Sequence, residues 1–399
     1  MFRRGFLQAL VSGVACACGP RPAGVTIAAP AAPSAGRAPL APLDPRVFLA
    51  RVDRVRALAR EAGAEWTFVS SGTTSFAYLT GASIERSERL IALLVPAAGD
   101  PVLVAPSFEV ERVRRSVRFQ ASIRGWEESQ SPFDVVRDAA ASRGAVLVEP
   151  HGEYGTAMAL SRALPDARLV DGSAAFASLR VVKQPEELAR IRRAVAITHD
   201  VFDRAFAELR PGVRDRDVSQ AIASAFEREG YEGYALVQFG ALSALPHGPP
   251  AGDGLASDVA VLIDGGCRVD GYWSDVTRTR WFGSSPPAEF RRVADVVAEA
   301  QRAGIDRARP GVEAQEVDRA ARAIIAKAGY GSYFTHRTGH GLGMDGHEPI
   351  YMVEGNRTPL VPGCVFTVEP GIYLPGRFGV RIEDDVVCED ASARVLEGA

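Results

Sequence analysis

Acidic residues occur as two matching pairs in the second half of the chain. Asp264 and Glu369 each follow an apolar run, so each should close a buried strand. Across a turn, each is followed by a second acid, Asp275 and Glu383 respectively. A carboxylate buried at such a position is costly unless it is paired or bound to a metal ion. A single pair of this kind would usually be solvated, but two matching pairs indicate four carboxylates that converge on cations.

Histidines gather in a glycine-rich stretch between the two acidic pairs. His336, His340 and His347 make up half of the six histidines in the chain. An isolated histidine is more often a structural residue, but three so close together favour a ligand among them. An oxygen-rich set with one imidazole favours Mn²⁺, Co²⁺ or Zn²⁺. Four carboxylates can hold two such ions about 3.5–4 Å apart, which would lower the pKa of a bridging water and supply hydroxide as a nucleophile.

Two other signals in this region are weak. The glycines at 341–346 match a dinucleotide-binding string, but no βαβ unit opens there. The dipeptide at 347–348 begins like a zincin motif, yet Tyr351 stands where the second histidine should be. We expect Asp384 and Asp385 to be surface groups at the end of a strand and not ligands.

The elements that position these residues form two related halves. Residues 210–234 and 309–333 align without a gap, and 9 of the 25 aligned positions are identical. Two copies are too few for a solenoid. Unless two alanine-rich helices match by chance, the likeness predicts two halves that face each other across a pseudo-twofold axis, each of which delivers one acidic pair.

A smaller α/β domain is predicted upstream, over residues 46–180. A helical pattern at 47–62 is followed by strand-like runs at 66–70, 90–95, 102–105 and 145–148. None of these runs forms a catalytic constellation. Pro185, followed by two glutamates, is typical of a helix start and marks the boundary to a second domain over residues 181–399.

The first 45 residues predict export and a tether. Residues 1–18 combine a positive start with a short apolar run, as in a secretory signal, and the paired arginines resemble a twin-arginine signal. Cys16 or Cys18 offers a point for lipid attachment, with ordinary cleavage as the alternative. Residues 19–45, rich in proline and alanine, indicate a linker. We therefore expect a periplasmic protein or a membrane-anchored lipoprotein.

The overall composition excludes several classes of protein. The 399 residues are 47% hydrophobic and 24% charged, as in a folded soluble protein and unlike a disordered or collagen-like chain. The 46 basic and 49 acidic side chains nearly cancel, so no electrostatic argument supports a nucleic-acid partner. Cys267, Cys364 and Cys388 lack the spacing of a zinc cluster, and we expect buried thiols.

Taken in order, the motifs resemble a known family. IDGG, GYWSDVTRT, HRTGHGLGMDGHEP, TVEPGIY and VRIED are similar to those of the pita-bread metallopeptidases, in the branch of Xaa-Pro aminopeptidase (aminopeptidase P) and Xaa-Pro dipeptidase (prolidase). The upstream domain is similar to the creatinase-like N-terminal domain of that family. The resemblance implies an α+β fold, with a pita-bread catalytic domain that contains an internal pseudo-twofold repeat and follows the smaller α/β domain.

The resemblance also implies a metal centre with two divalent ions, Mn²⁺ in the first place and Co²⁺ or Zn²⁺ as alternatives. Its five ligands would be Asp264, Asp275, His340, Glu369 and Glu383. Asp275 and Glu383 would bridge the ions, and Glu369 would also help to handle the proton of the attacking water.

On the substrate side, the resemblance implies further roles. His247 and His347 match catalytic histidines that contact the peptide, while His336, Tyr373 and Arg381 match groups that line the proline side or orient the site. Leu242 departs from the pattern, because the family often has asparagine there.

The activity implied is hydrolysis of Xaa-Pro bonds in dipeptides or longer peptides, by a homodimer or a higher homo-oligomer. Methionine aminopeptidases usually lack the upstream domain, so this activity is a less favoured interpretation than Xaa-Pro hydrolysis. One alternative within enzymes is hydrolysis of other peptides, esters or phosphotriesters. An alternative from another class is a non-catalytic peptide-binding protein that retains the site.

Overall fold

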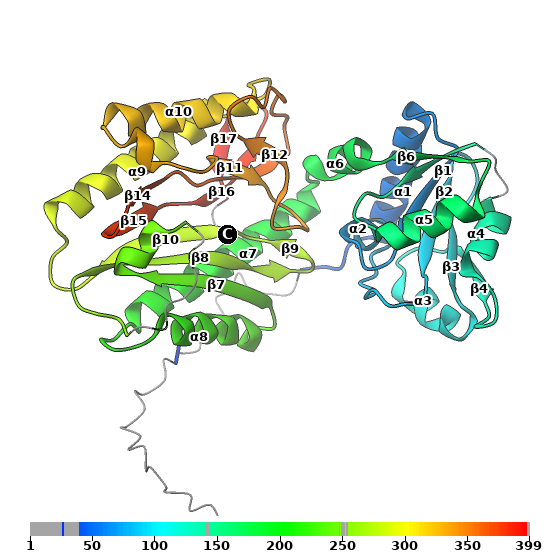
Figure 1. Ribbon diagram of the computed structural model, residues 1–399, viewed down its shortest axis with the longest axis horizontal. Coiled ribbons are helices and arrows are strands. Elements are labelled where there is room, and N and C mark those ends of the chain that lie inside the picture. The colour runs from blue at the N-terminus through cyan, green and yellow to red at the C-terminus, as the bar shows by residue number, and fades with distance from the viewer. Residues whose placement is uncertain are drawn as a thin grey trace, which may run out of the picture.

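The computed structural model describes residues 26–27, 40–140, 144–246, 248, 252 and 254–396. In this part the chain forms two domains, which are joined by the helix α6 (Ser173–Val181) (Figure 1). The predicted signal, most of the predicted linker and His247 lie outside the described residues. Within them, no helix is both long and apolar enough to cross a membrane.

The N-terminal domain is built on a mixed six-stranded sheet with the order β4-β3-β2-β1-β5-β6. Its strands are β1 (Trp66–Ser70), β2 (Ala92–Pro96), β3 (Val102–Pro106), β4 (Ser122–Trp126), β5 (Ala145–Val148) and β6 (Arg168–Asp171). β2 runs antiparallel to both of its neighbours, and the other pairs are parallel. The four strand-like runs predicted from the sequence are β1, β2, β3 and β5. The two strands that were not predicted, β4 and β6, are the edge strands, and they lack an apolar run because much of their surface is exposed.

Helices surround this sheet. They are α1 (Pro45–Glu61), α2 (Thr74–Thr80), the 3-10 turn η2 (Ser107–Glu109), α3 (Val110–Ser116), α4 (Pro132–Ala140) and α5 (Tyr154–Ala163). α1 begins where the Asp44 side chain accepts a hydrogen bond from the Arg46 amide, and it buries Phe48, Val52 and Val55. α1 packs against α2 and α6, which places α2 next to the junction with the second domain.

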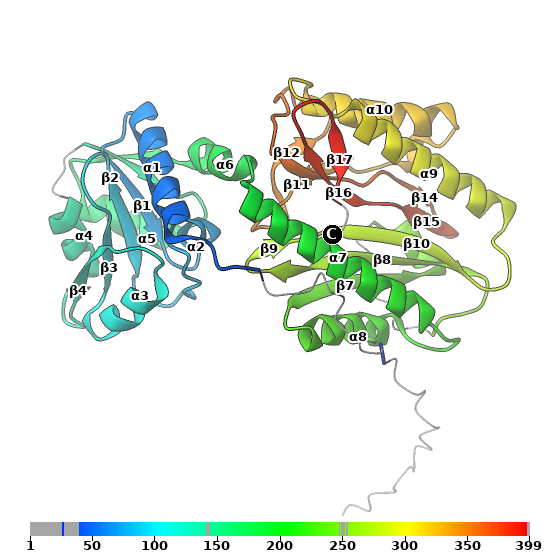
Figure 2. The same cartoon turned by 180° about the vertical axis from the view of Figure 1, so that it is seen from behind.

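The second domain contains two halves of similar construction. The first consists of α7 (Pro185–Ala207), α8 (Asp215–Arg228), β7 (Glu232–Phe239), η3 (Gly240–Ala244), β8 (Val259–Val269), β9 (Tyr272–Trp273) and β10 (Val276–Phe282). The order of its sheet is β10-β8-β7, with β9 paired to the end of β8. α7 crosses one face of this sheet (Figure 2).

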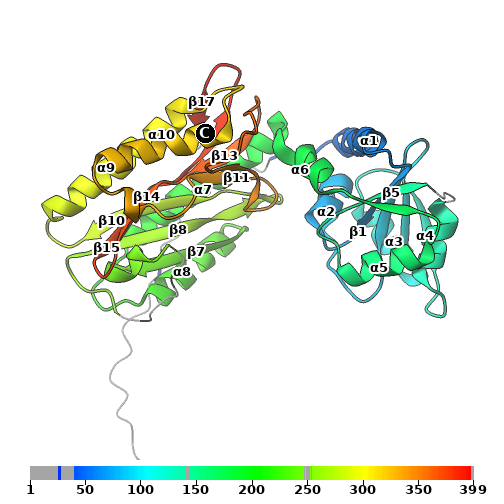
Figure 3. The ribbon, with the colours of Figure 1, turned by 45° about the horizontal axis from the view of Figure 1, so that its top comes forward.

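The second half repeats the pattern of a helix pair followed by sheet. It consists of α9 (Ala288–Arg307), α10 (Ala314–Lys327), η4 (Gly331–Tyr333), β11 (Gly339–Gly341), β12 (Glu348–Met352), β13 (Val365–Val368), β14 (Gly371–Leu374), β15 (Phe378–Arg381), β16 (Asp384–Cys388) and β17 (Ala393–Val395). The order of its sheet is β12-β11-β13-β16-β17, while β14 and β15 form a separate pair. α9 and α10 lie side by side over these strands (Figure 3).

The internal repeat predicted from the sequence is present in the backbone. α10 begins and ends 99 residues after α8. The glycines at matching positions take the left-handed conformation, with φ +85° at Gly212, +82° at Gly311, +87° at Gly230 and +89° at Gly329. Glycine is required there because a Cβ makes this conformation unfavourable. The two halves meet at an isolated bridge between Thr277 and Glu383.

Candidate metal centre

The five predicted metal ligands come from five separate segments and from both halves of the second domain. Asp264 lies within β8, Asp275 lies between β9 and β10, His340 lies in β11, Glu369 directly follows β13, and Glu383 directly precedes β16. The bridge from Thr277 to Glu383 joins the two sheets at this point. The pseudo-twofold arrangement therefore brings one acidic pair from each half to the same place.

The ligand atoms of these residues form overlapping clusters. The carboxylates of Asp264, Asp275 and Glu383 form one set, and His340, Glu369 and Glu383 form a second, with all atoms of each set within 4.8 Å of one another. Glu383 belongs to both sets. Asp275, His340 and Glu383 are buried. Like charges held so close together in a buried place call for cations, and the donor set suits Mn²⁺, Co²⁺ or Zn²⁺.

The orientation of His340 makes one ring nitrogen available to a metal ion. Its Nδ1 lies 3.0 Å from the carbonyl oxygen of Gly341, which can only accept, so Nδ1 carries the proton. Its Nε2 faces Glu369 Oε1 at 3.5 Å and Asp275 Oδ2 at 3.8 Å. Burial, with a smaller contribution from His347, lowers the pKa of His340 to about 3. The imidazole is therefore neutral at pH 7, as a metal ligand must be.

The carboxylates respond to burial in the opposite direction. Burial raises the pKa of Glu369 to about 7. Burial, together with repulsion from neighbouring carboxylates, raises the pKa of Asp275 and of Glu383 well above the usual range. A bound cation supplies the opposite charge and reverses this tendency.

Two residues that support the carboxylates were not among the predicted site residues. The Thr277 hydroxyl lies 2.6 Å from Glu383 Oε2 and 2.9 Å from Asp264 Oδ1. The amide of Asp275 donates to Asp385 Oδ2 at 3.1 Å. A threonine or aspartate of this kind fixes the orientation of a ligand without touching the metal ion. Their only signal in the sequence was adjacency to the predicted ligands.

The expectation that Asp384 and Asp385 are surface groups is wrong. Asp384 is 9% exposed and Asp385 is 1% exposed. Both are buried because β16 is an inner strand of its sheet. Asp384 accepts from Arg278 at 2.5 Å and from Gln301 at 2.8 Å. Neither aspartate belongs to the clusters of candidate ligands among the described residues.

Three of the predicted substrate-side residues form a chain of hydrogen bonds that ends at a ligand. Arg381 donates to Asp264 Oδ2 at 2.6 Å and to the hydroxyl of Tyr373 at 2.8 Å. His336 Nδ1 lies 2.7 Å from the Arg337 carbonyl and must donate to it, so Nε2 accepts from the Tyr373 hydroxyl at 2.7 Å. Burial raises the pKa of Tyr373 to about 12, which keeps this hydroxyl protonated.

The remaining site residues differ in how the structure places them. His347 is exposed, and its ring lies 3.9 Å from that of His340, centroid to centroid. His247 lies outside the described residues. Tyr234, which was not among the predicted site residues, is about half exposed, and partial desolvation together with the charge of Asp275 raises its pKa. Its signal was present, since it closes the first copy of the repeat.

Comparison with known proteins agrees with this fold and this site. Residues 51–182 match the creatinase/prolidase N-terminal domain, and residues 189–390 match metallopeptidase family M24. A creatinase-type domain thus precedes a pita-bread metallopeptidase domain, as the resemblance implied. The chain belongs to metallopeptidase family M24.

Among its relatives are two named dipeptidases. The chain is 36% identical to the probable dipeptidase PepE of Mycobacterium tuberculosis, over 88% of this chain and 95% of that protein. It is 34% identical to the Xaa-Pro dipeptidase of Lactobacillus helveticus, over 85% of this chain and 94% of that one. The crystal structure of dipeptidase PepE from Mycobacterium ulcerans superimposes with a TM-score of 0.83 at 33% identity, over 90% of this chain and 98% of that chain.

Proposed function

We propose that this protein is a metal-dependent exopeptidase that hydrolyses Xaa-Pro bonds. The observation that carries the proposal is the convergence of four carboxylates and one neutral histidine from both halves of the catalytic domain. Membership of a metallopeptidase family and the Xaa-Pro dipeptidase of L. helveticus among the relatives support it.

The proposed metal centre holds two divalent ions, with Mn²⁺ as the first candidate. Asp264, Asp275, His340, Glu369 and Glu383 would hold these ions. The shared role of Asp275 and Glu383 between the two ions rests on the resemblance alone. When bound, such ions lower the pKa of water and polarise a carbonyl. Thr277 and Asp385 hold the ligands in register, which limits the reorganisation that binding requires.

The other residues of the chain act on the peptide. His347, exposed beside His340, is placed to hydrogen-bond the peptide near the bond that is cleaved. Arg381 and Tyr373 fix His336 on the proline side through the hydrogen-bond chain described above. Glu369 accepts the proton of the attacking water and returns it to the leaving nitrogen. We assign His247 to the same substrate side on the resemblance alone.

Proline explains why a dedicated site is needed. Its nitrogen carries no hydrogen in a peptide bond and its ring fixes φ, so enzymes that grip an extended backbone through that N–H lose a contact. The names of the relatives favour dipeptides as substrates over longer peptides.

The test is an assay of the purified protein with Mn²⁺ on Ala-Pro, Gly-Pro and a longer Xaa-Pro-Xaa peptide, beside Gly-Gly and a chelated control. Cleavage of the dipeptides alone would identify a dipeptidase, and cleavage of the longer peptide an aminopeptidase. If two ions bind and none of these peptides is cleaved, the proposal fails, and esters and phosphotriesters become the substrates to test.

We also propose that the protein is exported and that it forms a homo-oligomer. The sequence pattern of residues 1–18 supports export, with lipid attachment at Cys16 or Cys18. Cell fractionation of the wild type and of a Cys16→Ser, Cys18→Ser double variant would test export and lipid attachment. Loss of the lipid alone should release an exported protein from the membrane into the soluble fraction. Light scattering of the purified protein would give its oligomeric state.

A further inference from the structure

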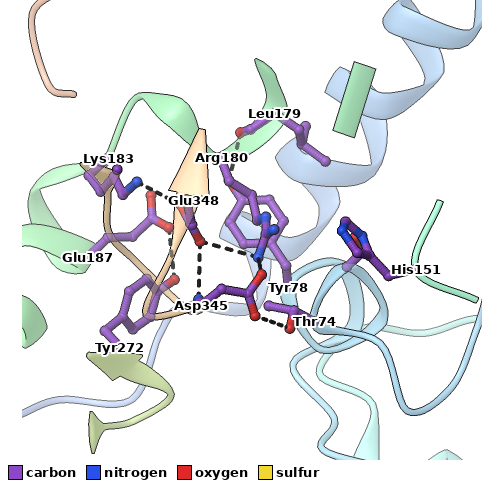
Figure 4. Close-up of polar contacts among 12 residues, drawn as sticks. Thr74, Tyr78, His151, Leu179, Arg180, Lys183, Glu187, Tyr272, Asp345 and Glu348 are labelled. Atoms are coloured by element: carbon purple, nitrogen blue, oxygen red, sulfur yellow. Dashed lines mark hydrogen bonds and ion pairs between the residues drawn. The ribbon is translucent and has the colours of Figure 1, made fainter. Parts of the chain in front are cut away.

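A network of charges, buried except at the partly exposed Asp345, joins the two domains at the loop that carries His347 (Figure 4). Nη1 of Arg180, in α6, lies 2.7 Å from Asp345 Oδ2 and 3.2 Å from Glu348 Oε1. Lys183, in the segment after α6, places its Nζ 2.9 Å from Glu348 Oε2. The side chains of Lys183 and Glu348 are each 2% exposed, so water screens this pair little.

The N-terminal domain reaches the same loop directly. Thr74, the first residue of α2, donates its hydroxyl to Asp345 Oδ1 at 2.5 Å. The amide of Asp345 donates to Glu348 Oε1 at 3.2 Å, which closes the loop on itself. Between them, Thr74, Arg180 and Lys183 give every oxygen of the two carboxylates a partner. Carboxylates whose oxygens all have a partner favour a single arrangement of the loop, although Nε of Arg180 has no hydrogen-bond partner among the described residues.

A second joint fixes the orientation of the N-terminal domain without involving this loop. Arg51, in α1, donates to Glu187 Oε1 at 3.0 Å and to the Tyr272 hydroxyl at 2.9 Å. Tyr272 donates in turn to the same oxygen of Glu187 at 2.8 Å. The domain that carries Thr74 is therefore held at two places, and Thr74 is a fixed point for the loop.

The network bears on one site residue in particular. His347 lies between Asp345 and Glu348, so a shift of these two residues moves His347. His340 is held by other contacts: its amide donates to Thr367 Oγ1 at 3.2 Å, and its Nδ1 donates to the Gly341 carbonyl. Movement of the loop would therefore change the distance between the two histidines and leave the carboxylate cluster in place.

We propose that Thr74, Arg180 and Lys183 are positioning residues for substrate binding. Acting through Asp345 and Glu348, they set His347 against the metal centre, so the N-terminal domain and the segment that joins the domains determine how well the peptide binds. This inference rests on the proposed function, in which His347 binds the peptide.

The first test compares three variants in steady-state kinetics on Ala-Pro with Mn²⁺. Thr74→Val keeps the shape of the side chain but removes the hydroxyl, and we expect KM to rise about 5- to 10-fold with kcat within about twofold, as for a loss of uniform binding. Thr74→Ser restores a hydroxyl and should restore KM. Arg54→Gln is the control at the same junction, because the hydrogen bond of Arg54 to the Ser178 carbonyl, at 3.5 Å, is exposed and does not involve the loop.

The second test does not depend on activity. Amide hydrogen exchange over residues 343–348 should be faster in Thr74→Val than in the wild type and in Thr74→Ser, while exchange in β8 stays unchanged. If the wild type cleaves Ala-Pro but Thr74→Val alters neither KM nor this exchange, the inference is wrong. If the wild type cleaves no Xaa-Pro bond, the proposed function fails. Faster exchange confined to the loop would then still support the coupling to the N-terminal domain, and unchanged exchange would overturn it.

Discussion

At the scale of single residues, the site combines groups with opposite needs in one small volume. The neutral imidazole of His340 offers a lone pair, whereas Asp275 and Glu383 are buried acids whose pKa values are raised. Without a cation, burial and mutual repulsion oppose the charge of these carboxylates more than the nearby Arg381 favours it. Such a cluster lowers the stability of the metal-free protein, and the proposed binding of metal ions explains why it is there.

Asp275 gives the sharpest test at this scale. Asp275→Asn removes a proposed bridging ligand, and we expect Mn²⁺ affinity and turnover to fall by more than about 100-fold. The metal-free variant should unfold at the same temperature as the metal-free wild type or higher, because asparagine removes the cost of burying an ionisable carboxyl group there. Titration calorimetry and thermal unfolding would measure the two effects.

Asp258→Asn is the matched control for that substitution. Asp258 has φ +60°, which asparagine tolerates, and it lies in the turn before β8. The Mn²⁺ affinity of the Asp258→Asn variant should equal that of the wild type. Equal metal affinity in Asp275→Asn and in the wild type would contradict the assignment of Asp275.

Tyr373 tests the chain of hydrogen bonds on the proline side. Tyr373→Phe removes the hydroxyl that Arg381 and His336 share, which leaves one buried donor of Arg381 without a partner. We expect a loss of about 1–3 kcal/mol in the free energy of unfolding and a lower kcat/KM. A double-mutant cycle with His336→Ala should show that the two losses are not additive. Strict additivity would mean that the two side chains act independently.

At the scale of elements, the repeat explains how two acidic pairs meet. α8 and α10 have the same length and begin 99 residues apart, and left-handed glycines flank both. The glycines that the two copies share therefore mark backbone geometry and not chemistry. The chemistry lies in the strands that follow, where the two halves differ in sequence but deliver matching carboxylates.

The glycines of the repeat predict equal costs at equivalent positions. A Cβ added to Gly230 or Gly329 meets no atom within 4 Å, so the cost of alanine is the backbone conformation alone. We expect Gly230→Ala and Gly329→Ala each to lower the free energy of unfolding by about 1–2 kcal/mol. Gly155→Ala, in α5 and equally free of contacts, should raise it by about 0.5–1 kcal/mol. Urea denaturation would measure all three, and a clear difference between the first two would contradict equivalent roles.

The sequence predicts the centre of this structure better than its edges. Apolar runs identify β1 and β5 to the residue because both strands are covered on two faces, whereas the exposed edge strands β4 and β6 leave no such pattern. Asp385 was expected at the surface because a charged residue at the end of a strand usually faces water. Only the order of the sheet reveals that β17 pairs with β16 and makes it an inner strand. The contact between Lys183 and Glu348 spans 165 residues, and no local pattern could predict it.

At the scale of the whole molecule, the proposed metal centre would link metal binding to the stability of the fold. The proposed ligands come from five segments of both halves, so bound ions would cross-link the catalytic domain. A ligand that binds only the folded state at 100 times its Kd stabilises it by about 2.7 kcal/mol. We therefore expect the unfolding temperature to rise with Mn²⁺ and to fall again when a chelator is added.

The same linkage sets a pH dependence. Burial raises the pKa of Glu369 from 4.5 to about 7, so between these values the folded metal-free protein holds a proton that the unfolded chain has lost. The contribution of this group to stability therefore falls as pH rises from about 4.5 to 7, and Asp275 and Glu383 act in the same direction. Mn²⁺ requires the ionised carboxylates, so its stabilising effect should grow over the same interval.

Thermal unfolding at pH 5.5 and pH 7.5, with and without Mn²⁺, would measure this effect. We expect the rise in unfolding temperature on adding Mn²⁺ to be larger at pH 7.5. In Glu369→Gln, which carries no titrating proton at this position, the metal-free protein should lose less stability between the two pH values than the wild type does. A shift with Mn²⁺ that is equal at both pH values would show that the ion binds away from these carboxylates, because only ligands that release protons couple its binding to pH.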